Sequence, residues 1–110
     1  MRCGGRRREE AVTESADEVQ VADNPARSCF EVHAGGELAG RADYRLLPGR
    51  MVLTHTEVGE RFAGRGLAGR LARVALDSAR DRGLAVTPEC EYMAGWIRKH
   101  PEYLPLVDGA

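Results

Sequence analysis

The chain has 110 residues, 43% of them apolar and 30% charged, a mixture typical of one globular domain. Its 16 basic and 17 acidic side chains give a net charge of -1, which supplies no general attraction for nucleic acids or anionic membranes. No apolar run approaches the roughly 20 residues of a membrane span, and we find no secretion signal, so we expect a cytoplasmic protein without nucleic-acid or membrane partners.

Three cysteines, Cys3, Cys29 and Cys90, are spread along the chain without the short spacings of metal ligands. An odd number of widely spaced cysteines does not predict a disulfide framework. We therefore expect reduced thiols and no metal site.

The first 26 residues carry many charges and few regularly spaced apolar side chains, and they end at Asn24-Pro25. We expect residues 1–26 to be a flexible leader and residues 27–110 to form the folded domain. A chain that begins near Ala26 should then keep its stability.

Strand signals begin at Cys29, where apolar and polar residues alternate as far as residue 33. Gly35-Gly36 predicts a tight turn, and residues 38–47 and 51–58 predict two further strands on either side of Pro48-Gly49. These spacings favour three consecutive antiparallel strands.

The apolar period then lengthens to 3.6, which predicts an amphipathic helix over about residues 66–82 that ends at Gly83. Residues 84–87 predict a short strand, and a right-handed crossover places it parallel to residues 51–58. A second helix is predicted over residues 91–99. The fold class is α/β, with one compact mixed sheet of about four strands and two main helices in a single domain.

The segment that favours a ligand site is Phe62-Ala63-Gly64-Arg65-Gly66-Leu67-Ala68-Gly69, between a strand and the long helix. Amides at a helix start have no intrahelical partners and attract phosphate oxygens. Glycines at 64 and 66 let a pyrophosphate approach the backbone, and Arg65, with Arg61 and Arg70, can add charge.

Three other interpretations of this segment were considered. The two glycines can simply form a tight loop, since short glycine patterns are common. A Rossmann site matches the spacing of Gly64, Gly66 and Gly69 but lacks the acidic residue that follows the next strand and the second mononucleotide half. A Walker loop would need Gly-Lys-Ser/Thr, which does not follow.

Three motifs together, Thr54-His55-Thr56-Glu57-Val58, Gly64-Arg65-Gly66-Leu67-Ala68 and Ile97-Arg98-Lys99-His100-Pro101-Glu102-Tyr103, resemble the minimal acetyltransferase-like branch of the GNAT superfamily. The resemblance covers about residues 28–107. In the Gln/Arg-x-x-Gly-x-Gly/Ala loop of that superfamily, Gly66 and Ala68 match the last two fixed positions, whereas Ala63 replaces the usual first residue.

The resemblance implies binding of acetyl-coenzyme A and transfer of its acetyl group to an amine. The pyrophosphate would lie on the loop, and the pantetheine arm would pair with the end of the strand that precedes it. The residues implied in cofactor binding are Thr56, Glu57, Val58, Ala63, Gly64, Arg65, Gly66, Leu67, Ala68 and Gly69.

Transfer to an amine needs a base for the ammonium proton and an acid for the leaving thiolate. Strict alternation would place Glu57, a candidate base, on one face with His55, Leu53 and Met51. His55 on the same face is a second catalytic candidate. For each residue a structural explanation is about equally good: Glu57 as a solvated carboxylate and His55 as a packed side chain.

Three further residues are candidates for the catalytic chemistry. Cys90 follows the short parallel strand, and relatives carry a cysteine there, although Glu91 follows it here where Cys-Pro or a small residue is usual. It can be a nucleophile, a group that orients the cofactor or a buried apolar side chain, and we favour direct transfer. Tyr92 and Tyr103 are candidate acids, but a tyrosine at helical spacing more often serves packing.

We therefore expect an acetyl-CoA-dependent N-acetyltransferase that acts on an amine of a small molecule or a protein lysine, as a monomer or weak dimer. The alternative is a coenzyme A-binding sensor or interaction module with little activity. A scaffold without ligand is a third, weaker interpretation.

Overall fold

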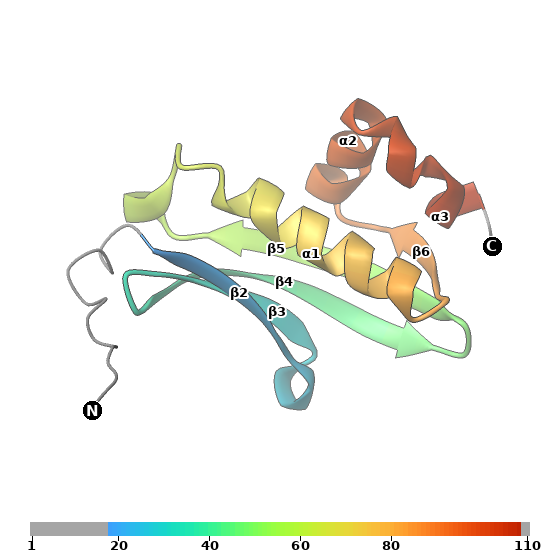
Figure 1. Cartoon of the computed structure of the whole chain (residues 1–110), viewed down its shortest axis with the longest axis horizontal. Helices are drawn as coiled ribbons and strands as arrows, with labels where there is room; N and C mark the ends of the chain where they lie inside the picture. The colour runs from blue at the N-terminus through green and yellow to red at the C-terminus, as the bar shows by residue number, and fades with distance from the viewer. Residues whose placement is uncertain (1–17, 109–110) are drawn as a thin grey trace, which may run out of the picture.

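Five strands form one sheet in the computed structural model, which describes residues 18–108 (Figure 1). Their order is β2-β3-β4-β5-β6, and all neighbours are antiparallel except β5 and β6, which are parallel. The strands are β2 (Val19–Asn24), β3 (Cys29–Ala34), β4 (Glu37–Leu47), β5 (Arg50–Val58) and β6 (Ala85–Pro88).

Helix α1 (Leu67–Asp81) makes the crossover from β5 to β6, and its apolar stripe packs on the sheet. Leu71, Ala75 and Leu76 on this stripe are fully buried. The other helical elements are η2 (Pro25–Arg27), η3 (Glu60–Phe62), α2 (Glu91–Lys99), η4 (Pro101–Tyr103) and α3 (Leu104–Asp108). Among the residues that the structure describes, no helix is both long and apolar enough to cross a membrane.

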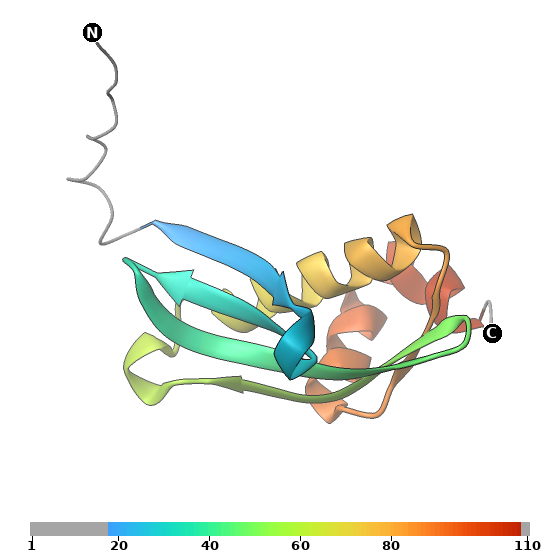
Figure 2. The same ribbon diagram turned by 90° about the horizontal axis from the view of Figure 1, so that it is seen from below.

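The helices α1 and α2 lie on the same side of the sheet, which we call the helix face (Figure 2). The core fills this side, where side chains of β3, β4 and β5 such as Val32, Tyr44 and Leu53 meet the helices. The other side, the open face, carries no α-helix within residues 18–108 (Figure 2). The expected mixed α/β fold in one compact domain is confirmed, with one strand more than expected.

The additional strand is β2, and it corrects the expected boundary of the leader. All six residues of β2 pair with β3, Val19 and Val21 pack against the core, and the Tyr44 hydroxyl donates to Asp23 Oδ1 at 2.7 Å. Residues 19–27 therefore belong to the folded domain, and residues 1–17 lie outside the described residues. The strand was missed because only two apolar side chains alternate among polar ones, which is enough for an edge strand but too few to form a recognisable face.

Removing β2 should destabilise the domain. A chain that begins at Ala26 loses the packing of Val19 and Val21 and leaves the buried Tyr44 hydroxyl without Asp23, for an expected loss of roughly 2–3 kcal/mol. Thermal unfolding should then begin about 10 °C lower or more. A chain that begins at Asp17 keeps the whole strand and is the matched control. Equal melting temperatures for the two truncated chains would contradict the structural role of β2.

Candidate functional site

The sheet opens beside β5 at its carboxyl end. Strand β6 pairs only with residues 50–53 of β5, and the last contact is the bond from the Cys90 amide to the Leu53 carbonyl at 3.0 Å. From residue 54 to residue 58, the side of β5 that faces away from β4 has no strand partner within residues 18–108. We call this stretch the free β5 edge.

A β-bulge at Thr54 changes which side chains share a face. The register between β4 and β5 passes from Tyr44↔Leu53 to Asp43↔His55, so Thr54 is left without a partner of its own. Thr56 then lies opposite the fully buried Ala42 and hence on the helix face.

The bulge corrects the alternation expected for β5. Met51 and Leu53 are buried on the helix face, whereas His55 and Glu57 lie on the open face and are exposed. Strict alternation fails because the extra residue shifts the pleat by one position.

The same register shows which backbone groups the free β5 edge presents. The bond from the Gly59 amide to the Ala39 carbonyl, 2.8 Å long, continues the β4–β5 ladder. In an antiparallel ladder the bonded residues alternate, so His55 and Glu57 bond to β4 while the amides and carbonyls of Thr56 and Val58 point outward. Of the residues expected to pair with the pantetheine arm, Thr56 and Val58 present a free backbone, and Glu57 presents only its side chain.

The glycine-rich loop ends at the first turn of α1. Gly64 and Gly66 have φ angles of +82° and +75°, and Gly66 is the N-cap of the helix. A Cβ placed on either glycine would meet no heavy atom within 4 Å, so the space above both is open. The first intrahelical bond runs from the Arg70 amide to the Gly66 carbonyl at 3.2 Å, which leaves the amides of Leu67, Ala68 and Gly69 as the helix-start donors.

Arginine side chains lie close to this loop. Arg61 and Arg65 both lie against the ring of Phe62, with guanidinium carbons 4.9 and 5.6 Å from its centroid. Arg61 also forms an ion pair with Glu37 at 2.9 Å. Arg65 is exposed beside the two glycines and is therefore better placed than Arg61 to meet an anion on the loop. Ala63 offers no polar side chain there.

Helix α2 approaches the loop and the free β5 edge. The Cys90 thiol, at the N-cap of α2, donates to Thr56 Oγ1 at 3.4 Å. A Cβ on Gly69 would lie 3.3 Å from Trp96 Nε1 and 3.8 Å from the Tyr92 hydroxyl, so the absence of a side chain at Gly69 permits this approach. The Tyr92 side chain is exposed, with its hydroxyl near Gly69. Partial burial, and then the neighbouring Cys90, raise the pKa of this phenol.

Glu57 lies within a polar network on the open face. Its Oε1 lies 3.3 Å from His55 Nε2 and 3.5 Å from Arg41 Nη1, and Arg41 also donates to Asp43 at 3.0 Å. The bond to Asp43 is the main cause that raises the pKa of Arg41. The network connects the two side chains of β5 to Arg41 of β4 while leaving more than half of the Glu57 side chain exposed to water.

Tyr103 is a candidate catalytic residue whose hydroxyl the structure holds on α1. Its buried hydroxyl donates to Asp77 Oδ1 at 2.7 Å and accepts a bond from Arg73 at 3.4 Å. Asp77 lies eleven residues beyond Gly66, about 16 Å along the helix. Burial, and then the bond to Asp77, raise the pKa of Tyr103. These contacts fasten the C-terminal segment to α1.

The substitution Tyr103→Phe should therefore affect stability rather than catalysis. Losing the bond to Asp77 should cost roughly 1–2 kcal/mol and lower the melting temperature by about 5–10 °C. Tyr92→Phe is the matched control, because it removes a hydroxyl beside Gly69 and should change turnover more than stability. Thermal melts and activity assays on both variants test this, and a Tyr103→Phe protein that melts normally but has lost its activity would contradict it.

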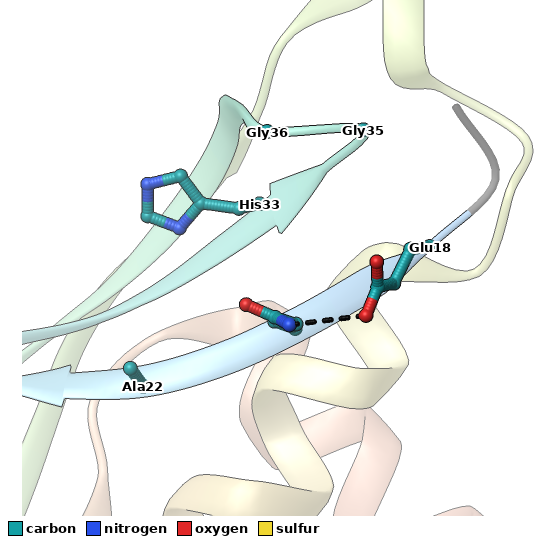
Figure 3. Close-up of a pocket in the computed structure, with 6 residues that line it drawn as sticks. Glu18, Ala22, His33, Gly35 and Gly36 are labelled. Carbon is teal, nitrogen blue, oxygen red and sulfur yellow. Dashed lines mark hydrogen bonds between the residues drawn. The ribbon is translucent and has the colours of Figure 1, made fainter. Parts of the chain in front are cut away.

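Hollows of the molecular surface lie at several places around this arrangement. One of about 540 Å³ is bordered by residues of β2, β3 and the following turn: Glu18, Gln20, Ala22, His33, Gly35 and Gly36 (Figure 3). Another of about 580 Å³ lies on the open face around Cys29, Glu31, Arg41 and Asp43. A third hollow, of about 450 Å³, borders the glycine-rich loop at Phe62 and Arg65. None of these three hollows includes residues 54–58, so we assign the chemistry to the free β5 edge and not to a closed pocket.

Two contributors to the site were missed from the sequence. Arg41 has no motif around it, and only the pairing of β4 with β5 places it against Glu57. Trp96 packs against the core, its ring stacks on His100 with centroids 3.7 Å apart, and its Nε1 faces Gly69. Helical spacing after Tyr92 was the only signal that could have placed Trp96 beside the first turn of α1.

Comparison with known proteins gives one family and two relatives of similar length. The model of the family described as GCN5-related N-acetyl-transferase matches residues 29–106. Protein NATD1 of Gallus gallus is 34% identical over 86 residues, which cover 76% of this chain and 77% of that protein. Protein NATD1 of Xenopus tropicalis is 37% identical over 49 residues, covering 44% of this chain and 45% of that protein.

Among solved structures, the NMR structure of a GCN5-like protein from Staphylococcus aureus has a TM-score of 0.61. The two chains are 18% identical, and the match covers 84% of this chain and 88% of that one. At this level of identity the likeness shows a shared fold.

Proposed function

The chain belongs to the GCN5-related N-acetyltransferase family, and from this premise we propose that it transfers the acetyl group of acetyl-coenzyme A to a primary amine. The acceptor is an amine of a small molecule or a protein lysine, and the protein acts in the cytoplasm. One observation supports the proposal most. Helix α2 lies against both the start of α1, where backbone amides are free, and the free β5 edge, and it places Tyr92 near the first and Cys90 near the second.

The residues present fit coenzyme A. Open space above Gly64 and Gly66 leaves room for the pyrophosphate, and the amides at the start of α1 together with the helix dipole favour its charge. Thr56 and Val58 offer backbone donors and acceptors to the amide groups of a pantetheine arm, as an added strand would require. Arg65 supplements the charge of the loop, and the missing side chain at Ala63 leaves the amides unaffected.

Three side chains of the protein then have separate roles in the transfer. Acetyl-coenzyme A supplies the thioester, whose carbon forms a bond to the amine nitrogen while its bond to sulfur breaks. Glu57, exposed next to the free β5 edge, accepts the proton that the ammonium must lose, and His55 at 3.3 Å holds the carboxylate in place. A tyrosine phenol is protonated at neutral pH, so Tyr92 can donate its proton to the departing sulfur and recover the second proton that the nitrogen loses.

A second candidate function is a coenzyme A-binding module with little turnover. The exposure of Glu57 and its ion pair with Arg41 favour this alternative, since a solvated and paired carboxylate is a weaker base than a buried one. Both functions require the loop, so binding of the cofactor cannot separate them.

Two measurements separate the transferase from the binding module. The first is calorimetric titration with coenzyme A, and the second is an assay of thiol release from acetyl-CoA in the presence of lysine peptides, polyamines or small amines. Micromolar binding together with release of thiol that depends on the amine supports the transferase. Binding without release supports the module, and absence of binding would overturn both.

A further inference from the structure

The strand β2 ends the sheet with an exposed edge. Strand β3 pairs with one side of β2, and within residues 18–108 no strand pairs with the other side, as Figures 1 and 2 show for the blue strand. Edge strands are commonly protected by lysine, proline or a bulge. The sequence of β2, Val-Gln-Val-Ala-Asp-Asn, contains neither residue, and its register with β3 is continuous over all six residues.

The pairing with β3 shows which groups of β2 point outward. The Gly35 amide bonds to the Glu18 carbonyl at 2.8 Å, so Glu18 and Gly35 form a bonded pair of the antiparallel ladder. Bonded pairs alternate along such a ladder, so Gln20 and Ala22 bond to β3 while the amides and carbonyls of Val19, Val21 and Asp23 face outward.

The outward-facing amides and carbonyls of β2 can pair with those of a second copy of β2. If a second β2 runs antiparallel with Val21 opposite Val21, then Val19 lies opposite Asp23 of the copy, and each of these pairs can exchange two hydrogen bonds. On the open face, Gln20 then lies opposite Ala22. No two like charges meet directly, and a two-fold axis through Val21 relates the halves.

The surface next to the edge is also suited to a copy of itself. A hollow of about 410 Å³ lies between β2 and α1, lined by Val21, Val74 and two arginines of the first half of the helix, Arg70 and Arg73. A second hollow shares Val74 and continues along the second half of α1, where Asp77 and Asp81 lie beside Arg82. A two-fold axis places the first half of one helix beside the second half of the other, so Arg70 of each chain approaches a half whose Asp77 and Asp81 also lie 3.2 and 3.5 Å from Arg80.

We propose that the chain forms a symmetric dimer through antiparallel pairing of β2 with β2, which extends the two sheets into one. Both α1 helices then lie on the same side of the joined sheet. The free β5 edge is at the far side of each sheet from β2, so the dimer leaves both candidate sites accessible. The proposed interface consists of six strand residues and the hollow at Val21 and Val74, and it buries less surface than the interface of a permanent dimer. We therefore expect a dissociation constant on the order of micromolar.

Sedimentation equilibrium over a range of concentrations tests the proposal, with the mass expected to rise from 12.0 kDa toward twice that value. The informative variant is Val21→Pro, because the Val21 amide points outward and proline is tolerated in an edge strand at such a position. It removes the central donor from both chains and should weaken association at least tenfold. Circular dichroism and thermal melting establish that the variant is folded.

Gln20→Lys is the matched control, because the lysine would lie opposite the small Ala22 and should leave association within about twofold. Val21→Lys, which places two lysines at the axis, is a second disruptive variant and should again give a monomer. Full-length protein that stays monomeric at millimolar concentration would overturn the proposal. A dimer that is insensitive to both Val21 variants would also overturn it, because the interface would then lie elsewhere.

Sedimentation equilibrium of a chain that begins at Asp17 tests whether the N-terminal residues of the same chain, and not a second copy, pair with the outer edge of β2. If residues 1–17 of the same chain pair with β2, the full-length protein is a monomer and the shortened chain a dimer, which would overturn the proposal for the full-length protein. Equal association of both chains supports it.

Discussion

Replacing Gly66 by valine should weaken the binding of coenzyme A at least tenfold, a change of roughly 1.4 kcal/mol. Gly66 holds a φ angle of +75° at the N-cap of α1, and a Cβ there would project into space that no protein atom occupies. In the proposed function this space receives the pyrophosphate. A β-branched side chain both occupies it and disfavours the left-handed conformation that aims the first amides of α1 at the ligand.

Valine at Gly66 both strains the backbone and blocks the space for the pyrophosphate, and these two effects have to be separated. Gly83 provides a matched control for the backbone strain. Gly83, just beyond the other end of α1, has a φ angle of +71° and likewise no heavy atom within 4 Å of an added Cβ. Gly83→Val should therefore lower the melting temperature about as much as Gly66→Val without changing the affinity. Calorimetric titration of both folded variants decides. Equal affinities would mean that the loop does not hold the cofactor.

Arg65→Ala provides an independent check on the same loop. It removes one exposed charge and leaves every amide in place, so the loss of affinity should be smaller than for Gly66→Val and should fade as salt is added.

The sequence was sufficient to predict the elements that depend on local patterns. The helix expected over residues 66–82 is found at Leu67–Asp81, and the glycine-rich loop lies at its start as expected. Cys90 was expected near the carboxyl ends of two parallel strands, and its thiol lies 3.4 Å from Thr56 Oγ1. Periodicity and helix-end chemistry involve residues within a few positions of one another, so one sequence contains the whole signal.

The features that the sequence did not predict depend on pairing between distant segments. The bulge at Thr54 exists only in the register of β5 with β4, and it reverses the face on which His55 and Glu57 lie. Tyr103 sits in a motif that looked functional, but its hydroxyl is held by Asp77 from another element. Strand register and long-range hydrogen bonds leave no periodic trace in the sequence, and for that reason both were assigned by the structure alone.

Replacing Glu57 by glutamine should lower turnover about 100-fold while changing the affinity for coenzyme A less than twofold. Glutamine keeps the shape and can still contact His55 and Arg41, but it cannot accept the proton of the ammonium. Asp43→Asn is the matched control, because it removes the other carboxylate bound to Arg41 and should leave most activity. If both variants lose activity equally, Glu57 acts only by positioning Arg41 and is not the base.

Cys90→Ser distinguishes direct transfer from a route through an acetyl-cysteine. In direct transfer the thiol only lines the free β5 edge, so serine, which can still bond to Thr56 Oγ1, should retain a third or more of the activity. An amine held against the thioester gains little from an additional covalent step, which is why we favour direct transfer. Brief exposure to acetyl-CoA followed by intact-protein mass spectrometry is the decisive measurement, with Cys3→Ser and Cys29→Ser as controls. A stoichiometric acetyl adduct that vanishes only in Cys90→Ser, and that an amine removes, would reverse the assignment and make Cys90 the nucleophile.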